Sequence, residues 1–322
     1  RILINTDSEE EGELCIGCAG GINVTSRFPC TREKVGGDWA VYRLSVTGLR
    51  GGHSGVDIHR NRGNAISLLF RILKETAGES GLRVSELDAG NMRNAIPREA
   101  FATVGVPAEL ARTFQSSLKA MGRAIHKEWE EREPAICIDA VPVAELPDQW
   151  IDAGIQERCV DAVGACPTGV VRMSEAIPGL VETSTNLSIV RLGSDCIDVC
   201  SLVRSSVDSA RVAVCRKIER LFTQAGASTE FDGRYPGWQP DPSSAILGLV
   251  RSVYLERFGK PAHVGAIHAG LECGILGDTY PELDMISLGP TIRYPHSPDE
   301  RVHIPSVGRF WDLLTGTLER IQ

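Results

Sequence analysis

Asp7 and His296 are the two residues whose setting in this sequence best suits metal binding. Asp7 follows a short apolar run, residues 2–4, as expected of a buried strand that presents a carboxylate at its carboxyl end. His296 stands between two prolines, close to carboxylates, in a loop expected between a strand and a helix. Plainer interpretations exist for both, because Asp7 could cap a helix and His296 could be an exposed loop histidine.

Three further polar residues stand in expected loops or at a strand end. Glycines surround His53 in the stretch GLRGGHSG, which predicts a loop and equally suits a simple turn histidine. Asn94 precedes Pro97 in an expected turn, and Arg204 ends an expected strand, where a surface ion pair is the plain alternative. The residues alone leave these alternatives open.

Cys15 and Cys18 have the C-x-x-C spacing that zinc sites and redox pairs both use. No second pair of this kind, and no matching histidine pair, follows at zinc-ribbon spacing. The ten cysteines are scattered mainly through apolar segments. We therefore expect reduced core thiols in a cytoplasmic protein.

Composition and charge are those of an ordinary globular protein. The 322 residues are 42% hydrophobic and 24% charged, which allows two domains and a substantial core. A net charge of −8 argues against nucleic acid or an anionic membrane as the main partner. Since no apolar run approaches the length of a bilayer span, we expect a soluble protein without a membrane or nucleic-acid partner.

Hydrophobic periodicity predicts a mixed α/β chain. Strands are expected over residues 2–4, 15–24, 39–46, 82–87, 100–106, 135–141, 185–191, 195–204, 229–232, 262–266 and 284–288. Helices are expected over residues 61–76, 109–131, 148–163, 207–225, 244–258 and 307–321, with a short one after Gly270. The order of elements partly recurs, which suggests a duplicated or two-lobed middle region.

This order predicts a catalytic α/β domain with a mixed sheet, interrupted by an inserted α+β lid or dimerisation domain. Residues 1–37 and 236–322 are assigned to the catalytic domain and residues 38–235 to the lid, since insertions enter at surface loops. The polar stretch 25–37 is the expected crossing, and the Pro- and Gly-rich segment 233–242 is the clearest linker. Because the chain begins with Arg and enters a core-type strand at once, we expect an N-terminally truncated fragment.

Six stretches together amount to a family resemblance. In chain order they are INTDSEEEGE with CIGCAGG, GLRGGHSGVDIH, GNMRNAIPREA, LVRSSVDS, AIHAGLECG and GPTIRYPHSPDERVHI. They resemble the aminoacylhistidine dipeptidases (Xaa-His dipeptidases, carnosinase-like), a branch of the di-zinc metallopeptidases. The resemblance covers nearly the whole chain. It implies hydrolysis of dipeptides by a metal-activated water, with two zinc ions, or cobalt or manganese in their place.

The resemblance also implies roles on the substrate side. His53 would donate to the scissile carbonyl oxygen, and Asn94 would hydrogen-bond the substrate. Arg204 would pair with the C-terminal carboxylate of the dipeptide, a task that suits a bidentate guanidinium. Gly270 would turn its backbone toward the substrate near a helix start, and the neighbouring His268 is expected at most to support it.

For the metals, the resemblance implies that Asp7 binds one ion and His296 the other. The family's bridging Asp, its His-x-Asp pair and its Glu-Glu pair, which includes the general base, have no match in this sequence. A two-metal peptidase needs these groups to hold both cations and to form the hydroxide. We therefore expect the 322-residue chain alone to be inactive, although the complete protein would be a hydrolase.

Two other functions stay open. One is a related amidohydrolase or deacylase of the same superfamily, and the other is a non-catalytic, truncated module for dimerisation or binding. Relatives with smaller inserted domains dimerise through them and donate the histidine in trans. The sequence leaves open whether His53 acts in cis or in trans, and whether the chain forms a homodimer.

Overall fold

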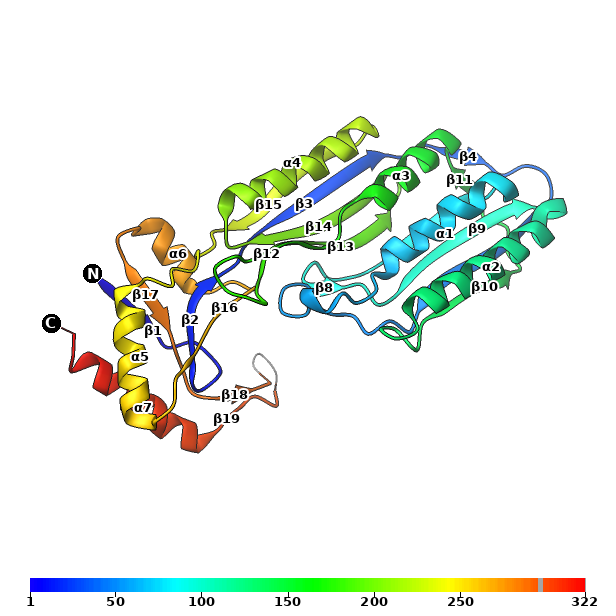
Figure 1. Ribbon diagram of the computed structural model, residues 1–322. Coiled ribbons are helices and arrows are strands. Elements are labelled where there is room, and N and C mark those ends of the chain that lie inside the picture. The colour runs from blue at the N-terminus through cyan, green and yellow to red at the C-terminus, as the bar shows by residue number, and fades with distance from the viewer. Residues whose placement is uncertain (295–297, 322) are drawn as a thin grey trace.

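Two sheets of unequal size lie at opposite ends of an elongated molecule in the computed structural model, which describes residues 1–294 and 298–321 (Figure 1). The smaller sheet contains both the first strand of the chain and segments from its last quarter. The larger sheet contains most of the middle of the chain. Each sheet has its own hydrophobic core.

The smaller sheet has four strands in the order β1 (Ile2–Asn5), β17 (Asp284–Ser287), β2 (Glu13–Cys18) and β16 (His263–Ile267). β1 runs parallel to β17 and β16 parallel to β2, whereas β17 is antiparallel to β2. The helices of this part are α5 (Ala245–Phe258), α6 (Glu272–Thr279) and α7 (Ile304–Leu318). Residues of α5, such as Val250 and Val253, share a core with Leu14, Ile16 and Ile286 of the sheet. The expected mixed sheet with helices is therefore present.

The larger sheet has nine strands. Their order is β10 (Cys137–Val143), β5 (Trp39–Thr47), β9 (Ala100–Pro107), β7 (Arg83–Ala89), β13 (Val181–Leu192), β14 (Cys196–Ser205), β3 (Gly20–Pro29) and β15 (Ser228–Tyr235), with β12 (Gly169–Met173) paired to β13. Four helices cover one of its faces: α1 (Ala65–Ser80), α2 (Ala111–Trp129), α3 (Ala153–Ala165) and α4 (Asp208–Gln224) (Figure 1). The opposite face of the sheet is left free to form a site.

The larger sheet is built from two copies of one motif. Lobe 1 (residues 39–143) runs β5, α1, β7, β9, α2, β10, and lobe 2 (residues 20–29 and 153–235) runs β3, α3, β13, β14, α4, β15. From its outer edge inward, lobe 1 has the strand order β10, β5, β9, β7, and lobe 2 has the order β15, β3, β14, β13. In both lobes these strands are the sixth, first, fourth and third of the six elements. The lobes meet where β7 pairs with β13, at Ala89 opposite Val190 and Asp88 opposite Arg191. The two lobes therefore share one order of elements, as expected of a two-lobed region.

The point where the chain enters the larger sheet differs from the prediction. Residues 25–37 were expected to be a polar crossing, but residues 20–29 form β3, a strand between β14 and β15. Polar residues are buried there because they bond across strands, as Ser26 Oγ does with Thr229 Oγ1 at 2.8 Å. The chain therefore changes sheets at Ala19, and lobe 1 is inserted between the first strand and first helix of lobe 2.

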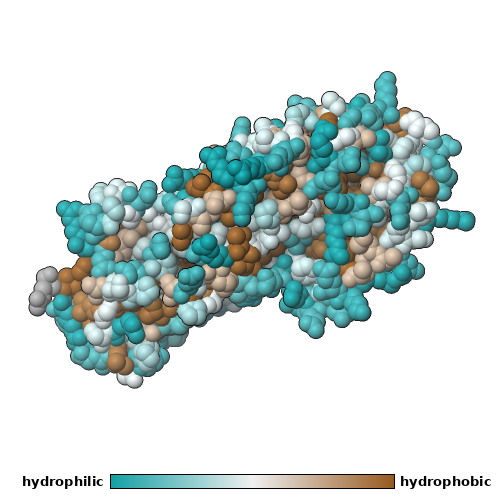
Figure 2. All heavy atoms as spheres, turned by 45° about the horizontal axis from the view of Figure 1, so that its top comes forward, coloured by the Kyte–Doolittle hydropathy of each residue, from teal (hydrophilic) through white to brown (hydrophobic). Residues whose placement is uncertain are grey.

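Three short strand pairs complete the structure: β4 (Arg32–Lys34) with β11 (Gln149–Ile151), β6 (Gly52–His53) with β8 (Ala95–Ile96), and β18 (Ile292–Arg293) with β19 (Arg301–Val302). None of the helices in residues 1–294 and 298–321 combines the length and the apolar character that crossing a bilayer requires. On the face drawn in Figure 2, hydrophilic atoms are widespread and hydrophobic ones lie in smaller groups between them.

The cysteine pair is part of the core. Cys15 and Cys18 are both buried free thiols. Cys15 Sγ donates to the carbonyl oxygen of Gly17 at 3.2 Å, and burial raises the pKa of this thiol to about 12. Burial thus favours the protonated thiol at Cys15. The expectation of core thiols is confirmed for this pair.

Candidate active site

One row of residues crosses four strands of lobe 2 on the face that the helices leave free. The pairing of β13, β14, β3 and β15 aligns Ser184 with Arg204, Arg204 with Gly21, and Gly21 with Tyr235. Residues directly opposite each other in an antiparallel pair point to the same side of the sheet. The register therefore brings a guanidinium and a phenol together over a glycine.

Arg204 is buried without a counter-charge. Only 6% of the residue is exposed, and Nη1 donates to the hydroxyl of Tyr235 at 2.6 Å. Its Nε finds no acceptor, and no carboxylate among residues 1–294 and 298–321 forms a salt bridge with it. Burial lowers the pKa of Arg204, an effect that Tyr235 opposes. An unpaired buried guanidinium is costly, so this position is suited to receive an anion.

Tyr235 is held in place by two glycines. A Cβ added at Gly21 would collide with the Tyr235 ring, and one added at Gly270 would lie 3.0 Å from its Cε2. The carbonyl oxygen of Tyr235 accepts from Arg211 Nη1 at 2.6 Å, and Arg211 is itself buried. The phenol that supports Arg204 therefore has little freedom to move. Gly270, which is expected to face the substrate, lies against this ring.

His53 is fixed as a neutral donor. Its Nδ1 accepts from the backbone N–H groups of Val56 at 3.0 Å and Gly55 at 3.2 Å, so the ring proton is assigned to Nε2. Burial and, next, the charge of Arg204 lower the pKa of His53, whereas Asp57 raises it. The backbone N–H of His53 donates to Asp57 Oδ2 at 3.0 Å. An Nε2–H group held in this way can polarise a carbonyl oxygen.

The His53 loop and Arg204 meet at Gly55. A Cβ added there would lie 3.1 Å from His53 Cε1 and 3.3 Å from Arg204 Cδ, and it would clash with the carbonyl oxygen of His268. Because all these groups belong to one chain, His53 stands beside Arg204 in cis. Two lobes and the turn after β16 converge on this glycine.

His268 is a buried, uncharged wall of this site. Its Nε2 and Ser184 Oγ are 2.7 Å apart, and burial lowers the pKa of His268 to about 3, with the charge of Arg204 as the next cause. The sequence motif AIHAG drew attention to it only as a neighbour of Gly270. No sequence signal identified Ser184 or Tyr235, since one lies in an ordinary strand and the other in an expected linker.

Asn94 lies beside the His53 loop. Its carbonyl oxygen accepts from the backbone N–H of Ser54 at 2.8 Å, next to the pairing of β6 with β8. Asn94 is exposed. The structure thus brings three of the residues expected on the substrate side, His53, Asn94 and Arg204, to one region.

Asp7, one of the two residues expected to bind metal, lies at the other sheet. Asp7 is exposed just beyond β1, and its backbone N–H donates to Asn5 Oδ1 at 2.6 Å. His296 lies outside the described residues. The flanking segments are neighbours, because Ile292 N donates to the carbonyl oxygen of Glu9 at 3.0 Å. Within residues 1–294 and 298–321 no group of three potential ligands is found. These residues alone do not fit a metal, so no step is assigned through one.

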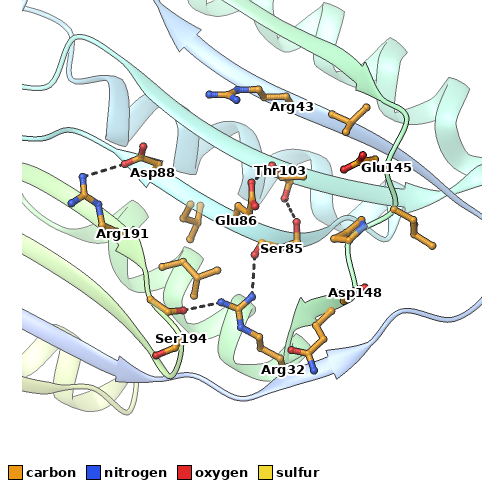
Figure 3. Close-up of a pocket in the computed structure, with 17 residues that line it drawn as sticks. Arg32, Arg43, Ser85, Glu86, Asp88, Thr103, Glu145, Asp148, Arg191 and Ser194 are labelled. Carbon is orange, nitrogen blue, oxygen red and sulfur yellow. Dashed lines mark hydrogen bonds and ion pairs between the residues drawn. The ribbon is translucent and has the colours of Figure 1, made fainter.

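Another hollow lies away from Arg204. It has a volume of about 1140 Å³ over the free face of the sheet, and two of the arginines that line it, Arg32 and Arg191, have polar partners (Figure 3). Arg32 donates to the carbonyl oxygens of Gly193 at 2.8 Å and Ser85 at 3.3 Å, and Arg191 pairs with Asp88 at 3.3 Å. These two arginines differ from Arg204, which is buried and forms no salt bridge with a described residue.

Comparison with known proteins agrees with this architecture. A family profile described as a peptidase dimerisation domain matches residues 44–133, which make up most of lobe 1. The cytosol non-specific dipeptidase of Escherichia coli (strain K12) is 44% identical over 320 residues. The chain belongs to the M20 peptidase family. Its motif resemblance to the aminoacylhistidine dipeptidases and its fold class, an α/β peptidase fold with an inserted dimerisation domain, are thereby confirmed.

A solved structure gives the same result for this M20 chain. The crystal structure of aminoacylhistidine dipeptidase from Vibrio alginolyticus covers 100% of the chain, with a TM-score of 0.95 and 43% identity. The chain spans 65% of that structure, and 99% of the chain spans 66% of the Escherichia coli protein. About two thirds of the length of these relatives is therefore represented.

Proposed function

We propose that this M20 chain belongs to a metal-dependent dipeptidase that hydrolyses the peptide bond of dipeptides, Xaa-His dipeptides among them. The observation that carries the proposal is Arg204, a buried guanidinium without a carboxylate partner among the described residues, beside a histidine fixed as a donor. A dipeptide offers the two matching groups, a terminal carboxylate and a carbonyl a few bonds away. The names of the relatives in Escherichia coli and Vibrio alginolyticus point to the same substrate class.

In this proposal the chain supplies the binding and polarising groups. Arg204 pairs with the C-terminal carboxylate, where the interaction is strong because the site is desolvated. His53 donates from Nε2 to the scissile carbonyl oxygen and stabilises the charge that develops there. Asn94 hydrogen-bonds the bound dipeptide, and Gly270 faces it from the turn after β16. These roles follow the family resemblance, and the cis arrangement around Gly55 supports them.

Metal use belongs to the same proposal. Asp7 is the proposed ligand within the described residues, and His296 is the proposed ligand outside them. Zinc is the finer expectation, with cobalt or manganese as alternatives.

Three assignments about the whole protein are also proposals. Residues 1–37 and 236–322 would form the catalytic domain, and residues 38–235 would form a lid over it. The strand β3 lies within the first of these ranges but belongs to the larger sheet, so it would be part of the lid. A homodimer through the inserted domain follows from the family profile over residues 44–133. A cytoplasmic location follows from the name of the Escherichia coli relative.

The test is hydrolysis of a Xaa-His dipeptide by the intact protein with added divalent metal, next to an N-acyl amino acid with the same terminal carboxylate. Faster turnover of the dipeptide supports the proposal, and faster turnover of the acyl substrate favours the deacylase. Binding of both without turnover favours a binding module. The expected inactivity of the 322-residue chain alone stays a prediction that the same assay tests.

A further inference from the structure

A buried carboxylate holds the base of the His53 loop. Glu133, four residues beyond the end of α2, is 0% exposed. Its Oε2 accepts from the backbone N–H of Arg50 at 2.8 Å, and its Oε1 accepts from the backbone N–H of Gly63 at 2.8 Å. One side chain therefore joins the first and last residues of the segment 50–63, and this segment carries His53.

The position of Glu133 itself is well determined. Its backbone N–H donates to the carbonyl oxygen of Trp129 at 2.7 Å, and its carbonyl oxygen accepts from Ile136 at 3.0 Å. The Glu133 side chain packs against Gly63, where an added Cβ would lie 3.3 Å from Glu133 Cγ. The carboxylate is thus delivered by the rigid connection between α2 and β10.

The segment 50–63 is also tied within itself. Asp57 accepts from the backbone N–H of His53 at 3.0 Å and forms an ion pair with Arg62 at 3.5 Å. Arg62 in turn donates to the carbonyl oxygen of Gly51. These bonds make the segment a unit, but they do not attach both of its ends to the lobe. Glu133 does, through two backbone donors that lie 13 residues apart.

The cost of this arrangement indicates that it has a purpose beyond burial. Among the described residues no cation forms a salt bridge with Glu133, and a buried ion without one is expensive unless hydrogen bonds compensate. Two charge-assisted bonds at 2.8 Å provide that compensation. A glutamine of equal shape could accept from one N–H and would turn its NH₂ group toward the other.

We propose that Glu133 is the positioning residue for His53, acting as a clamp on the two ends of its loop. This inference rests on the proposed function, because it takes from it the role of His53 in polarising the scissile carbonyl. Releasing the clamp lets the loop shift, and a displacement of about 1 Å at a polarising group can cost about 100-fold in rate. Arg204 lies on β14 and stays in place, so substrate affinity is retained.

The experiment compares Glu133→Gln with Glu131→Gln in the intact protein. Glu131 lies two residues away and is exposed, so it controls for the same chemical change. For Glu133→Gln we expect kcat to fall about 10- to 100-fold while KM changes less than about 3-fold. Amide hydrogen exchange at Arg50 and Gly63 should accelerate at least about 10-fold, without a matching increase across the sheet. Glu131→Gln should change none of these.

Four results would overturn the clamp. These are unchanged exchange at both amides, faster exchange with unchanged kcat, a parallel loss of kcat and affinity, and unprotected Arg50 and Gly63 amides in the wild-type protein. The exchange rates of the Arg50 and Gly63 amides in the wild-type protein need no variant, and they test the clamp even if Glu133→Gln fails to fold. If the wild-type protein hydrolyses no dipeptide, the proposed function fails, whereas the exchange data still report separately on the clamp.

Discussion

Replacing Arg204 by Met tests separately what its unpaired charge does for ligand affinity and for folding stability. Methionine has nearly the same length but no charge and no donor, so a bound carboxylate would lose its buried partner. Truncating one member of a buried, hydrogen-bonded charge pair costs about 2–4 kcal/mol. We therefore expect the affinity for a dipeptide with a free carboxylate to fall about 30- to 700-fold.

The same substitution should leave the ligand-free protein nearly as stable as before. A buried guanidinium without a counter-ion contributes little to stability, and an apolar replacement of similar volume is often neutral or favourable. The hydroxyl of Tyr235 loses its partner, which costs about 1 kcal/mol. We expect the free energy of unfolding to change by no more than about 1 kcal/mol.

Calorimetric titration with a dipeptide and with its C-terminal amide is the assay. The wild-type protein should prefer the free acid strongly, and Arg204→Met should bind the acid and the amide equally weakly. Arg191→Met is the matched control, because Arg191 is another arginine on lobe 2 but forms an exposed ion pair with Asp88. Equal wild-type affinity for acid and amide, or an equal loss of both in Arg204→Met, would refute the reasoning.

Three further predictions concern neighbouring groups. In steady-state kinetics, Tyr235→Phe should raise KM about 3- to 10-fold and leave kcat unchanged, because the Arg204 guanidinium loses its hydrogen bond to the Tyr235 hydroxyl. The control Tyr42→Phe should change neither KM nor kcat, since the Tyr42 hydroxyl bonds Gln115. His53→Gln should lower kcat about 100- to 1000-fold with a KM within a few-fold of wild type, and an equal effect on both constants would contradict a donor that acts in the transition state. The pKa of His268 is about 3 in the folded protein and about 6.5 in the unfolded chain, so between these pH values only the unfolded chain binds the proton. The free energy of unfolding should therefore fall as the pH drops from 6.5 toward 3, by up to about 1.4 kcal/mol per pH unit. Denaturant unfolding measures this slope, which should be shallower in His268→Gln.

Much of the fold could be predicted because its elements are strongly periodic. The helix expected over residues 109–131 is α2 (Ala111–Trp129), and the strand expected at residues 195–204 is β14 (Cys196–Ser205). One exception is β3, whose Ser26 and Arg27 resemble a loop. Their polar groups are satisfied across strands by residues about 170–200 positions away, and hydropathy cannot register such bonds.

The site was predictable where local chemistry is unusual and hidden where it depends on distant contacts. The glycine-rich surroundings of His53 marked it as a candidate. Tyr235 lies in a segment that resembles a linker, and its role depends on Arg204, which is 31 residues away. Glu133 ends the charged run EWEERE, where nothing distinguishes it from its exposed neighbours. Only the fold shows that its partners are backbone groups of the His53 loop.

The duplicated sheet explains how one chain brings His53 and Arg204 together. The His53 loop lies between the first strand and first helix of lobe 1, and in lobe 2 this place is taken by the whole inserted lobe 1. The two copies have therefore diverged in function, since lobe 1 provides the donor and lobe 2 provides the guanidinium. The direct β7–β13 pairing between the lobes spans two residue pairs, and Asn186 of lobe 2 adds a bond from Nδ2 to the carbonyl oxygen of Ala95 at 2.7 Å. Ala95 is the strand partner of His53, so this bond links the donor directly to the sheet that carries Arg204. Contacts between the lobes thus contribute to the separation of His53 and Arg204, in addition to the attachment of the His53 loop by Glu133.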